Sequence, residues 1–169
     1  MAQDKRKASH FDEVIRANEA DLWRYFQRRL TNPADAAEAY GELLLTAWKL
    51  HRKVPTDPTR ARMWLFVTAR HVMLSSRRTM SRRSAAVQRL VDDMTTNPPQ
   101  VDGPYVRELK DAMSALSDQD AELIRLIYWD RLPSHEAAAV LGINASTARS
   151  RLSKARQALR FELEARPPE

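Results

Sequence analysis

The sequence predicts an all-α protein in which a flexible linker joins two small helical domains. Three observations carry this prediction. Only three glycines occur among 169 residues, and the chain is rich in Ala, Leu and Arg, which favour helices. Apolar side chains recur at intervals of three and four residues, as in amphipathic helices. Residues 91–105 contain two adjacent prolines and a Gly-Pro pair, which predict a linker between domains at residues 1–90 and 106–169.

Two helices are expected to begin the first domain. Residues 1–9 are polar and expected to fray, and apolar residues at helical spacing then predict a helix over residues 11–31. A second helix is expected over residues 34–50. Asn32 or Asp35 is expected to cap it, because their side chains accept hydrogen bonds from the first backbone N–H groups.

A loop and a third helix complete the first domain. Pro55 and Pro58 disfavour a helix through residues 51–62, so a loop is expected there. A helix follows over residues 63–80, and Trp64 is expected to be buried in it, although it could instead stack on unpaired bases. The stripe expected to face the core comprises Trp64, Val67, His71 and Leu74, widened by Leu65 and Phe66.

The second domain is expected to hold a scaffold and a helical pair. Val106, Leu109, Met113 and Leu116 predict the buried stripe of one helix, and Ser117 is expected to cap the next. In residues 132–160, the caps and turn are expected at three positions that suit them. Ser134 would cap a short helix, Gly142 would end it in the left-handed conformation, and Asn144 would cap a longer helix.

This helical pair has the pattern of a helix-turn-helix. The turn around Gly142 is about three residues long, and no acidic residue occurs between Asn144 and Phe161. The second helix places small apolar residues on one face and serines with basic residues on the other. These features predict DNA binding, and the alternative is a helical hairpin with a solvated basic face.

Composition narrows the function classes. The net charge of +6 and the pI near 10.0 favour a polyanionic partner. Residues 1–90 hold 18 basic and 9 acidic side chains, a net charge of +9, whereas the remainder has a net charge of −3. The chain has no cysteine, no apolar run near the roughly 20 residues that span a bilayer, and no secretory signal at its start. A cytoplasmic protein without membrane insertion is expected.

Nothing in the sequence indicates catalysis. The four histidines are scattered without metal-ligand spacing, and three glycines do not suffice for a phosphate-binding loop. Acid pairs such as Asp92-Asp93 fall in the expected linker. We therefore expect no enzymatic activity, no catalytic residue, no metal site and no cofactor.

Three sequence runs resemble those of the extracytoplasmic-function sigma factors, the minimal type of the sigma-70 family. Residues 147–156, TARSRLSKAR, are similar to the family's T-V-[KR]-S-R-L-x-R-A-R in its region four. DAAEAYGELLLTAW, residues 35–48, resembles the helix that docks on RNA polymerase, and WLFVTAR, residues 64–70, resembles W-L-[YF]-x-I-A-R. Gly41, His71 and Ser75 depart from the commoner residues. The resemblance covers about residues 11–83 and 106–161.

The resemblance implies three surfaces and three partners. The partners are core RNA polymerase, promoter DNA and an anti-sigma factor that holds the protein inactive. The loop before the third helix would help to capture a flipped-out base. The residues implied for polymerase docking are Asp35, Glu38, Glu42 and Leu43; those for the downstream promoter element are Arg60, Arg62, Arg70, His71, Arg77 and Arg78; those for the upstream element are Ser146, Arg149, Ser150, Arg151, Ser153 and Lys154.

Two other classes of protein remain as alternatives. One is a free-standing helix-turn-helix transcriptional regulator that binds DNA without polymerase, and the other is an adaptor that binds only protein. The basic residues at the end of the third helix, such as Arg77 and Arg78, could merely stabilise a helix C-terminus. Two helical domains in one chain, each with a basic helix and one of them resembling a polymerase-docking element, favour the sigma-factor interpretation.

Overall fold

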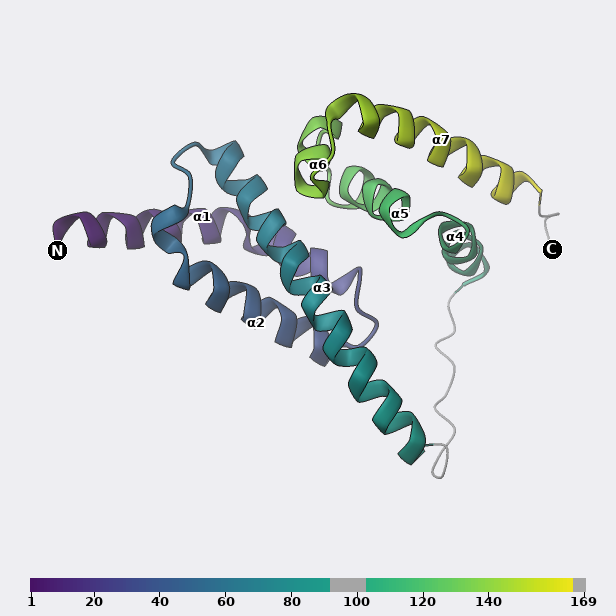
Figure 1. The fold of residues 1–169 in the computed structure, drawn as a ribbon, viewed down its shortest axis with the longest axis horizontal. Helices are drawn as coiled ribbons and strands as arrows, with labels where there is room; N and C mark the ends of the chain where they lie inside the picture. Colours follow the sequence, from purple (N-terminus) through teal and green to yellow (C-terminus); the bar gives the residue numbers. More distant parts are fainter. Residues whose placement is uncertain (92–102, 166–169) are drawn as a thin grey trace. The chain divides into compact units, whose positions relative to one another are not determined.

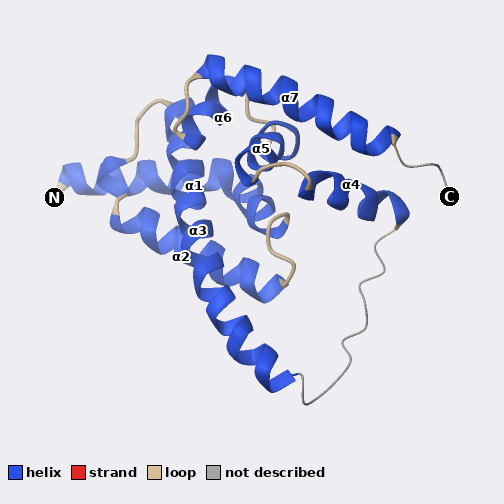
Figure 2. Cartoon of the chain, turned by 45° about the vertical axis from the view of Figure 1, so that its right-hand side comes forward, coloured by secondary structure: helices blue, strands red, loops and turns tan. Residues whose placement is uncertain are grey.

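The computed structural model describes residues 1–91 and 103–165, and within these ranges every regular element is a helix (Figure 2). The all-α prediction is thereby confirmed. The chain divides into two compact units, Met1–Met94 (unit 1) and Thr95–Glu169 (unit 2). Most of the predicted linker lies outside the described residues. None of the described helices has the length and apolar character needed to cross a bilayer.

Unit 1 is built from three long helices, each packed against the other two (Figure 1). They are α1 (Ala2–Gln27), α2 (Pro33–Lys49) and α3 (Pro58–Val91), and a 3₁₀ turn, η1 (His51–Lys53), follows α2. The expected frayed start is helical, so α1 begins well before residue 11. The expected third helix also begins five residues early, at Pro58.

Local caps explain where α2 and α3 begin. The Asn32 side chain accepts a 2.9 Å hydrogen bond from the Ala34 N–H, which confirms Asn32 as a cap of α2. The Asp57 side chain accepts a 2.9 Å hydrogen bond from the Arg60 N–H. Pro58 then occupies the first helical position, where a missing N–H costs nothing. Proline therefore begins α3 instead of excluding a helix.

The core of unit 1 is aromatic. Tyr25, Phe26 and Phe66 are almost fully buried, and the ring centroid of Tyr25 lies 5.2 Å from that of Phe26 and 5.7 Å from that of Phe66, both edge to face. Such pairs contribute about 0.5–1.5 kcal/mol each beyond the area they bury. Leucines from all three helices, Leu22, Leu43 and Leu65, complete this core.

The buried face of α3 is not the predicted one. His71 is exposed, Leu74 is 40% exposed, and Trp64 and Val67 are only partly buried. These four residues lie toward the outward side of α3, so this part of the predicted stripe is wrong, whereas Leu65 and Phe66 are fully buried as expected. The core-facing residues of α3 are Ala61, Leu65, Phe66, Thr68, Ala69, Val72 and Met73. Packing against α1 and α2 therefore selects a face of α3 that is rotated from the predicted stripe and shares only Leu65 and Phe66 with it.

Unit 2 begins with two helices and a short π-helical segment. α4 (Pro104–Ser114) leads through Ser117, whose hydroxyl accepts a 3.2 Å hydrogen bond from the Asp120 N–H, into α5 (Asp118–Ile124). The predicted cap at Ser117 is confirmed. The π-helical segment η2 (Arg125–Trp129) follows α5 directly. In α4, Val106 and Leu109 are exposed whereas Met113 is buried, so only part of the predicted stripe faces the core.

The helical pair has the predicted turn. α6 (Ser134–Leu141) ends at Gly142, which adopts the left-handed conformation at φ 68°. The Asn144 side chain then accepts a 2.7 Å hydrogen bond from the Thr147 N–H and caps α7 (Ala145–Glu164). The predicted cap at Ser134 is wrong, because Pro133 occupies the cap position and no side chain bonds there. Gly142, Ile143 and Asn144 form the short turn between the two helices.

Candidate functional site

The outward face of α7 gathers five of the six residues predicted for the upstream element. Ser146, Arg149, Ser150, Ser153 and Lys154 follow the spacing of three and four that places residues on one helix face, and all five are exposed. The opposite face is buried through Ala148, Leu152 and Ala155. Two arrangements therefore coincide on one helix: a small-residue face that packs on the unit, and a serine-rich basic face directed to solvent. A helix of this kind fits a DNA major groove.

Arg151, the sixth predicted residue, lies off this face. It is only partly exposed, and its guanidinium donates a hydrogen bond to the Gln119 side chain on α5. The contact joins α7 to α5 within unit 2. Arg151 is therefore placed as a link between helices, apart from the surface that the other five residues share.

A basic stripe runs along the outward face of α3. Arg60, His71, Arg77 and Arg78 are exposed and Arg70 is partly exposed. At 100° per residue these five positions fall within about 120° of one another on the helix circumference. Over the 18 residues from Arg60 to Arg78 the stripe is about 27 Å long at 1.5 Å per residue. Five of the six residues predicted for the downstream element thus form one surface.

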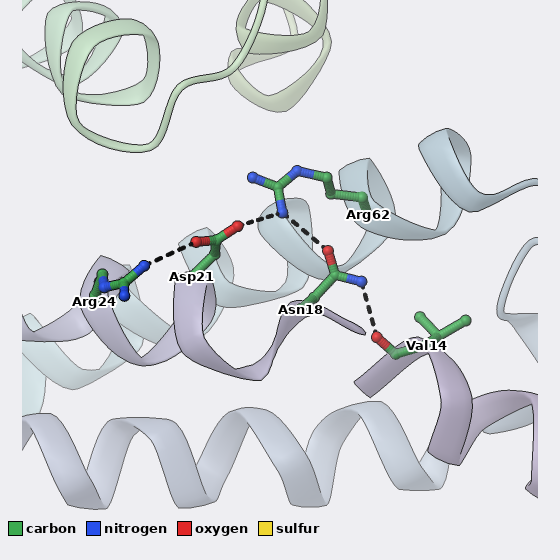
Figure 3. Close-up of polar contacts among 5 residues, drawn as sticks. All are labelled: Val14, Asn18, Asp21, Arg24 and Arg62. Atoms are coloured by element: carbon green, nitrogen blue, oxygen red, sulfur yellow. Dashed lines mark hydrogen bonds and ion pairs between the residues drawn. The ribbon is translucent and has the colours of Figure 1, made fainter. Parts of the chain in front are cut away.

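Arg62 is the exception, because it faces α1. Its Nη1 donates 2.9 Å hydrogen bonds to Asn18 Oδ1 and Asp21 Oδ2, as Figure 3 shows. Asn18 is buried and donates in turn to the Val14 carbonyl oxygen at 2.8 Å, and Arg24 also bonds to Asp21. The guanidinium of Arg62 additionally lies 4.9 Å from the Phe66 ring centroid. The structure therefore assigns Arg62 to the α1–α3 contact and removes it from the basic stripe on the outward face of α3.

The loop between α2 and α3 is held from a side that the sequence did not indicate. The carboxylate of Asp4 forms a 2.9 Å ion pair with Arg52, and Lys7 donates to the Arg52 carbonyl oxygen at 3.2 Å. His10 donates from Nε2 to the Pro55 carbonyl oxygen at 2.8 Å. These contacts explain why residues 2–10 are helical. The absence of Gly and Pro from the first ten residues was the one available signal.

The predicted docking residues on α2 divide into exposed and buried positions. Glu38 and Glu42 are exposed one turn apart, and Asp35 is partly exposed on the same face. Leu43 is fully buried in the core of unit 1, so the prediction that it belongs to the docking surface is wrong. Leu45, which the prediction left out, is 56% exposed beside Glu42 and continues the face.

Two further features surround the α2 face. Trp48 is 48% exposed and stacks on the His51 ring at 4.8 Å between centroids. Tyr40 packs edge to face on Trp23, and burial together with the nearby charge of Glu19 raises the pKa of the Tyr40 hydroxyl. Tyr40 therefore stays neutral and adds no charge to the acidic face. Within the described residues no three His, Asp or Glu side chains are grouped to hold a metal ion.

Two family regions match this chain in order. Sigma-70 region 2 matches residues 14–83 in unit 1, and sigma-70 region 4 matches residues 106–159 in unit 2. The first match contains the α2 face and the α3 stripe, and the second contains the helix-turn-helix.

Whole-chain relatives agree with both regions. The chain is 36% identical over 151 residues to the ECF RNA polymerase sigma factor SigL of Mycobacterium tuberculosis, which covers 86% of this chain and 84% of that protein. It is 26% identical over 160 residues to the RNA polymerase sigma-E factor of Streptomyces coelicolor, covering 92% of this chain and 87% of that protein.

Two solved structures share the fold. One is the sigma factor RpoE in complex with the anti-sigma factor NepR from Bartonella quintana, with a TM-score of 0.63, 24% identity, and coverage of 92% of this chain and 99% of that one. The other is CnrH in complex with the cytosolic domain of CnrY, with a TM-score of 0.65, 21% identity, and coverage of 93% and 89%. Since a 36% identical relative spans most of the sequence and both regions match in order, the chain belongs to the extracytoplasmic-function sigma factors of the sigma-70 family.

Proposed function

We propose that this sigma factor divides its work among three surfaces. The acidic face of α2 docks on core RNA polymerase, the basic stripe of α3 with the preceding loop holds the opened downstream element, and the outward face of α7 reads the upstream element. The observation that carries the proposal is the segregation of charge in unit 1. Its α2 face is acidic, whereas residues 1–90 have a net charge of +9.

Charge supports docking through α2. Glu38 and Glu42 project from a domain that is otherwise basic, so this face repels DNA and suits a basic protein surface. Leu45 and Trp48 add exposed apolar area on the same helix. An acidic rim beside apolar side chains is a composition that suits protein contact better than nucleic-acid contact.

The α3 stripe supports contact with DNA during opening. Arg60, Arg70, Arg77 and Arg78 lie on one outward face with His71, and cations spaced along a helix suit a phosphate backbone. Trp64 is partly exposed on this same face, which leaves part of its ring available for stacking on an unpaired base. The stripe therefore offers both kinds of contact that single-stranded DNA requires.

The face of α7 supports reading of base edges. Ser150, Ser153 and Lys154 lie near its centre and are proposed to contact bases, whereas Arg149 is proposed to contact a phosphate. In one of the two solved structures, the sigma factor RpoE is bound to the anti-sigma factor NepR. We extend that partnership to this chain, and we expect it to act in the cytoplasm as a regulatory subunit without catalytic activity of its own.

The docking surface is tested by reversing its charge. Glu38→Lys with Glu42→Lys should abolish co-purification with core polymerase and promoter-specific transcription, because two favourable charges become repulsive. Asp12→Lys with Glu13→Lys is the matched control, since it makes the same change in charge on the exposed side of α1. The control should bind core polymerase and transcribe normally. Circular dichroism checks that both variants remain helical.

Two results would contradict the proposal. Normal transcription by the Glu38→Lys, Glu42→Lys variant in a reconstituted assay would remove α2 as the docking surface. Tight and selective promoter binding by the wild-type chain alone, measured by gel shift with and without core polymerase, would favour a free-standing regulator. We expect weak binding with little specificity from the isolated chain.

A further inference from the structure

The first turns of α1 belong to none of the three proposed surfaces. Residues 2–10 extend α1 beyond the three-helix core of unit 1 and lie against η1 and the loop at residues 51–57. Three polar side chains from successive turns, Asp4, Lys7 and His10, reach that loop. The helix extension thus contacts the same loop that is proposed to capture an unpaired base.

Two of the contacts are made to Arg52 and the third is made to Pro55. Arg52 donates from Nε to Asp4 Oδ1 at 3.0 Å, in addition to the Nη2 contact at 2.9 Å. Lys7 and His10 bond to backbone carbonyl oxygens, those of Arg52 and Pro55. Because a carbonyl oxygen only accepts, Nε2 of His10 carries the hydrogen in this contact. Two of the three contacts therefore fix the backbone itself.

The remaining contacts hold the loop against the rest of unit 1 and leave its tip, which begins at Thr56, exposed to solvent. Val54 is buried at 8% exposure, and Trp48 packs between the Phe11 ring at 5.4 Å and the His51 ring. Asp57 caps α3 at the other end. Thr56 and the residues that follow it up to Arg60 are exposed. The loop is held along one side while its tip faces solvent.

We propose that Asp4, Lys7 and His10 are positioning residues that pre-order the 51–57 loop for capture of an unpaired promoter base. The inference rests on the proposed role of this loop in promoter opening. Ordering a loop before binding removes from the capture step part of the entropic cost of ordering it. Loss of these contacts should therefore slow opening without changing the docking surface on α2.

The test uses holoenzyme assembled from core polymerase and the full chain, on a promoter that the wild-type holoenzyme selects from a randomised library. Asp4→Ala should slow open-complex formation about two- to fivefold, the range of an exposed ion pair. His10→Ala should slow it roughly two- to tenfold, the range of one hydrogen bond. Permanganate reactivity of unpaired thymines over time measures opening, and the affinity for core polymerase should stay at its wild-type value.

Three matched variants separate positioning from a general loss of structure. Asp12→Ala removes an exposed acid from the same helix, away from the loop contacts, and should open promoters normally. Asp4→Arg with Arg52→Asp exchanges the paired charges and should restore the rate that Asp4→Ala loses. His10→Gln keeps a donor of similar reach and should restore the rate that His10→Ala loses. In the free chain, amides of the 51–57 loop should exchange hydrogen faster in the two alanine variants.

The outcomes distinguish this inference from the proposed function. If shortening the 51–57 loop leaves opening normal, the proposed role of the loop fails. If the shortened loop blocks opening while the Asp4→Ala, His10→Ala double variant opens at the wild-type rate, only the positioning inference is overturned. It is also overturned if the double variant loses affinity for core polymerase in parallel, or if the charge exchange restores nothing.

Discussion

The two units of this sigma factor solve the packing of a small helical domain differently. Among the described residues, the largest fully buried side chains include three aromatic rings, and all three, Tyr25, Phe26 and Phe66, lie in unit 1. The core of unit 2 uses Leu123, Leu126 and Leu132 among many alanines. Unit 1 therefore fills its interior with aromatic rings and leucines, whereas the large, fully buried side chains described in unit 2 are leucines alone.

The difference extends to what each unit leaves open. Unit 2 carries a groove of about 580 Å³ between α4, η2 and α7, lined by Met113, Ile124, Leu159 and Leu163 among others. Exposed Leu109 and Tyr128 continue its apolar lining. In unit 1 the described functional faces are charged instead. An apolar groove thus opens between helices of unit 2, whereas the acidic face of α2 and the basic stripe of α3 lie on the outside of unit 1.

The largest expected effect follows from the aromatic core. Phe66→Ala should lower the free energy of unfolding of unit 1 by about 3–5 kcal/mol, because it leaves a cavity where no side chain can collapse fully. Phe161→Ala, the same change at a 70% exposed position of unit 2, should stay within about 0.5 kcal/mol of wild type. Urea unfolding followed by hydrogen exchange of peptides from each unit measures both. Equal losses of unfolding free energy at the two positions would contradict the proposed difference between the two cores.

The buried alanines of unit 2 predict that its stability is sensitive to added side-chain volume. Ala148 is fully buried where α7 packs on its neighbours, so Ala148→Leu should cost about 1–3 kcal/mol of unit 2 stability through overpacking. Ala158→Leu adds the same volume at an exposed position of α7 and should be nearly neutral. The same exchange experiment applies. A stable Ala148→Leu variant would show that the interhelical space is larger than the burial indicates.

The face of α7 that we propose to contact DNA allows a test at the surface of unit 2. Lys154→Ala should change the preferred upstream sequence at a cost of about 1–3 kcal/mol, as expected for a base-reading side chain. Arg149→Ala should weaken all sequences alike and reduce the salt slope by about 1, as expected for one phosphate contact. Binding-site selection and salt titration with the holoenzyme separate the two. An unchanged sequence preference for Lys154→Ala would remove it from base reading.

The smallest effect separates two neighbouring arginines of α3. Arg62→Ala should destabilise unit 1 by about 1 kcal/mol, because the buried Asn18 loses a charged donor. Arg60→Ala should leave stability unchanged and weaken binding to a single-stranded downstream oligonucleotide in the holoenzyme. Thermal unfolding and fluorescence anisotropy measure the two properties. If Arg62→Ala mainly weakened DNA binding, the assignment of Arg62 to the α1–α3 contact would fail.

The local sequence was enough to predict the all-helical class and the helix-turn-helix with its turn. Gly142 and Asn144 act within one turn of the backbone, through φ at 68° and a cap at 2.7 Å, so neighbouring residues suffice to predict them. The exposed face of α7 was predictable for a similar reason. Its serines and basic residues alternate with alanines and leucines at a period that only one helix orientation satisfies.

The buried face of α3, and the polar side chains that bond to other residues of the same unit, became known only from the tertiary structure. Two stripes of α3 are apolar enough to pack, and the choice depends on the shapes of α1 and α2, which lie far away in sequence. The sequence predicted that three further residues lie on binding surfaces, but neighbouring helices engage all three. Arg62 bonds to Asn18, Leu43 is buried in the core, and Arg151 bonds to Gln119. The first turns of α1 are held by contacts to Arg52 and Pro55. Because these partners lie more than 40 residues further along the chain, the local sequence did not predict the helix there.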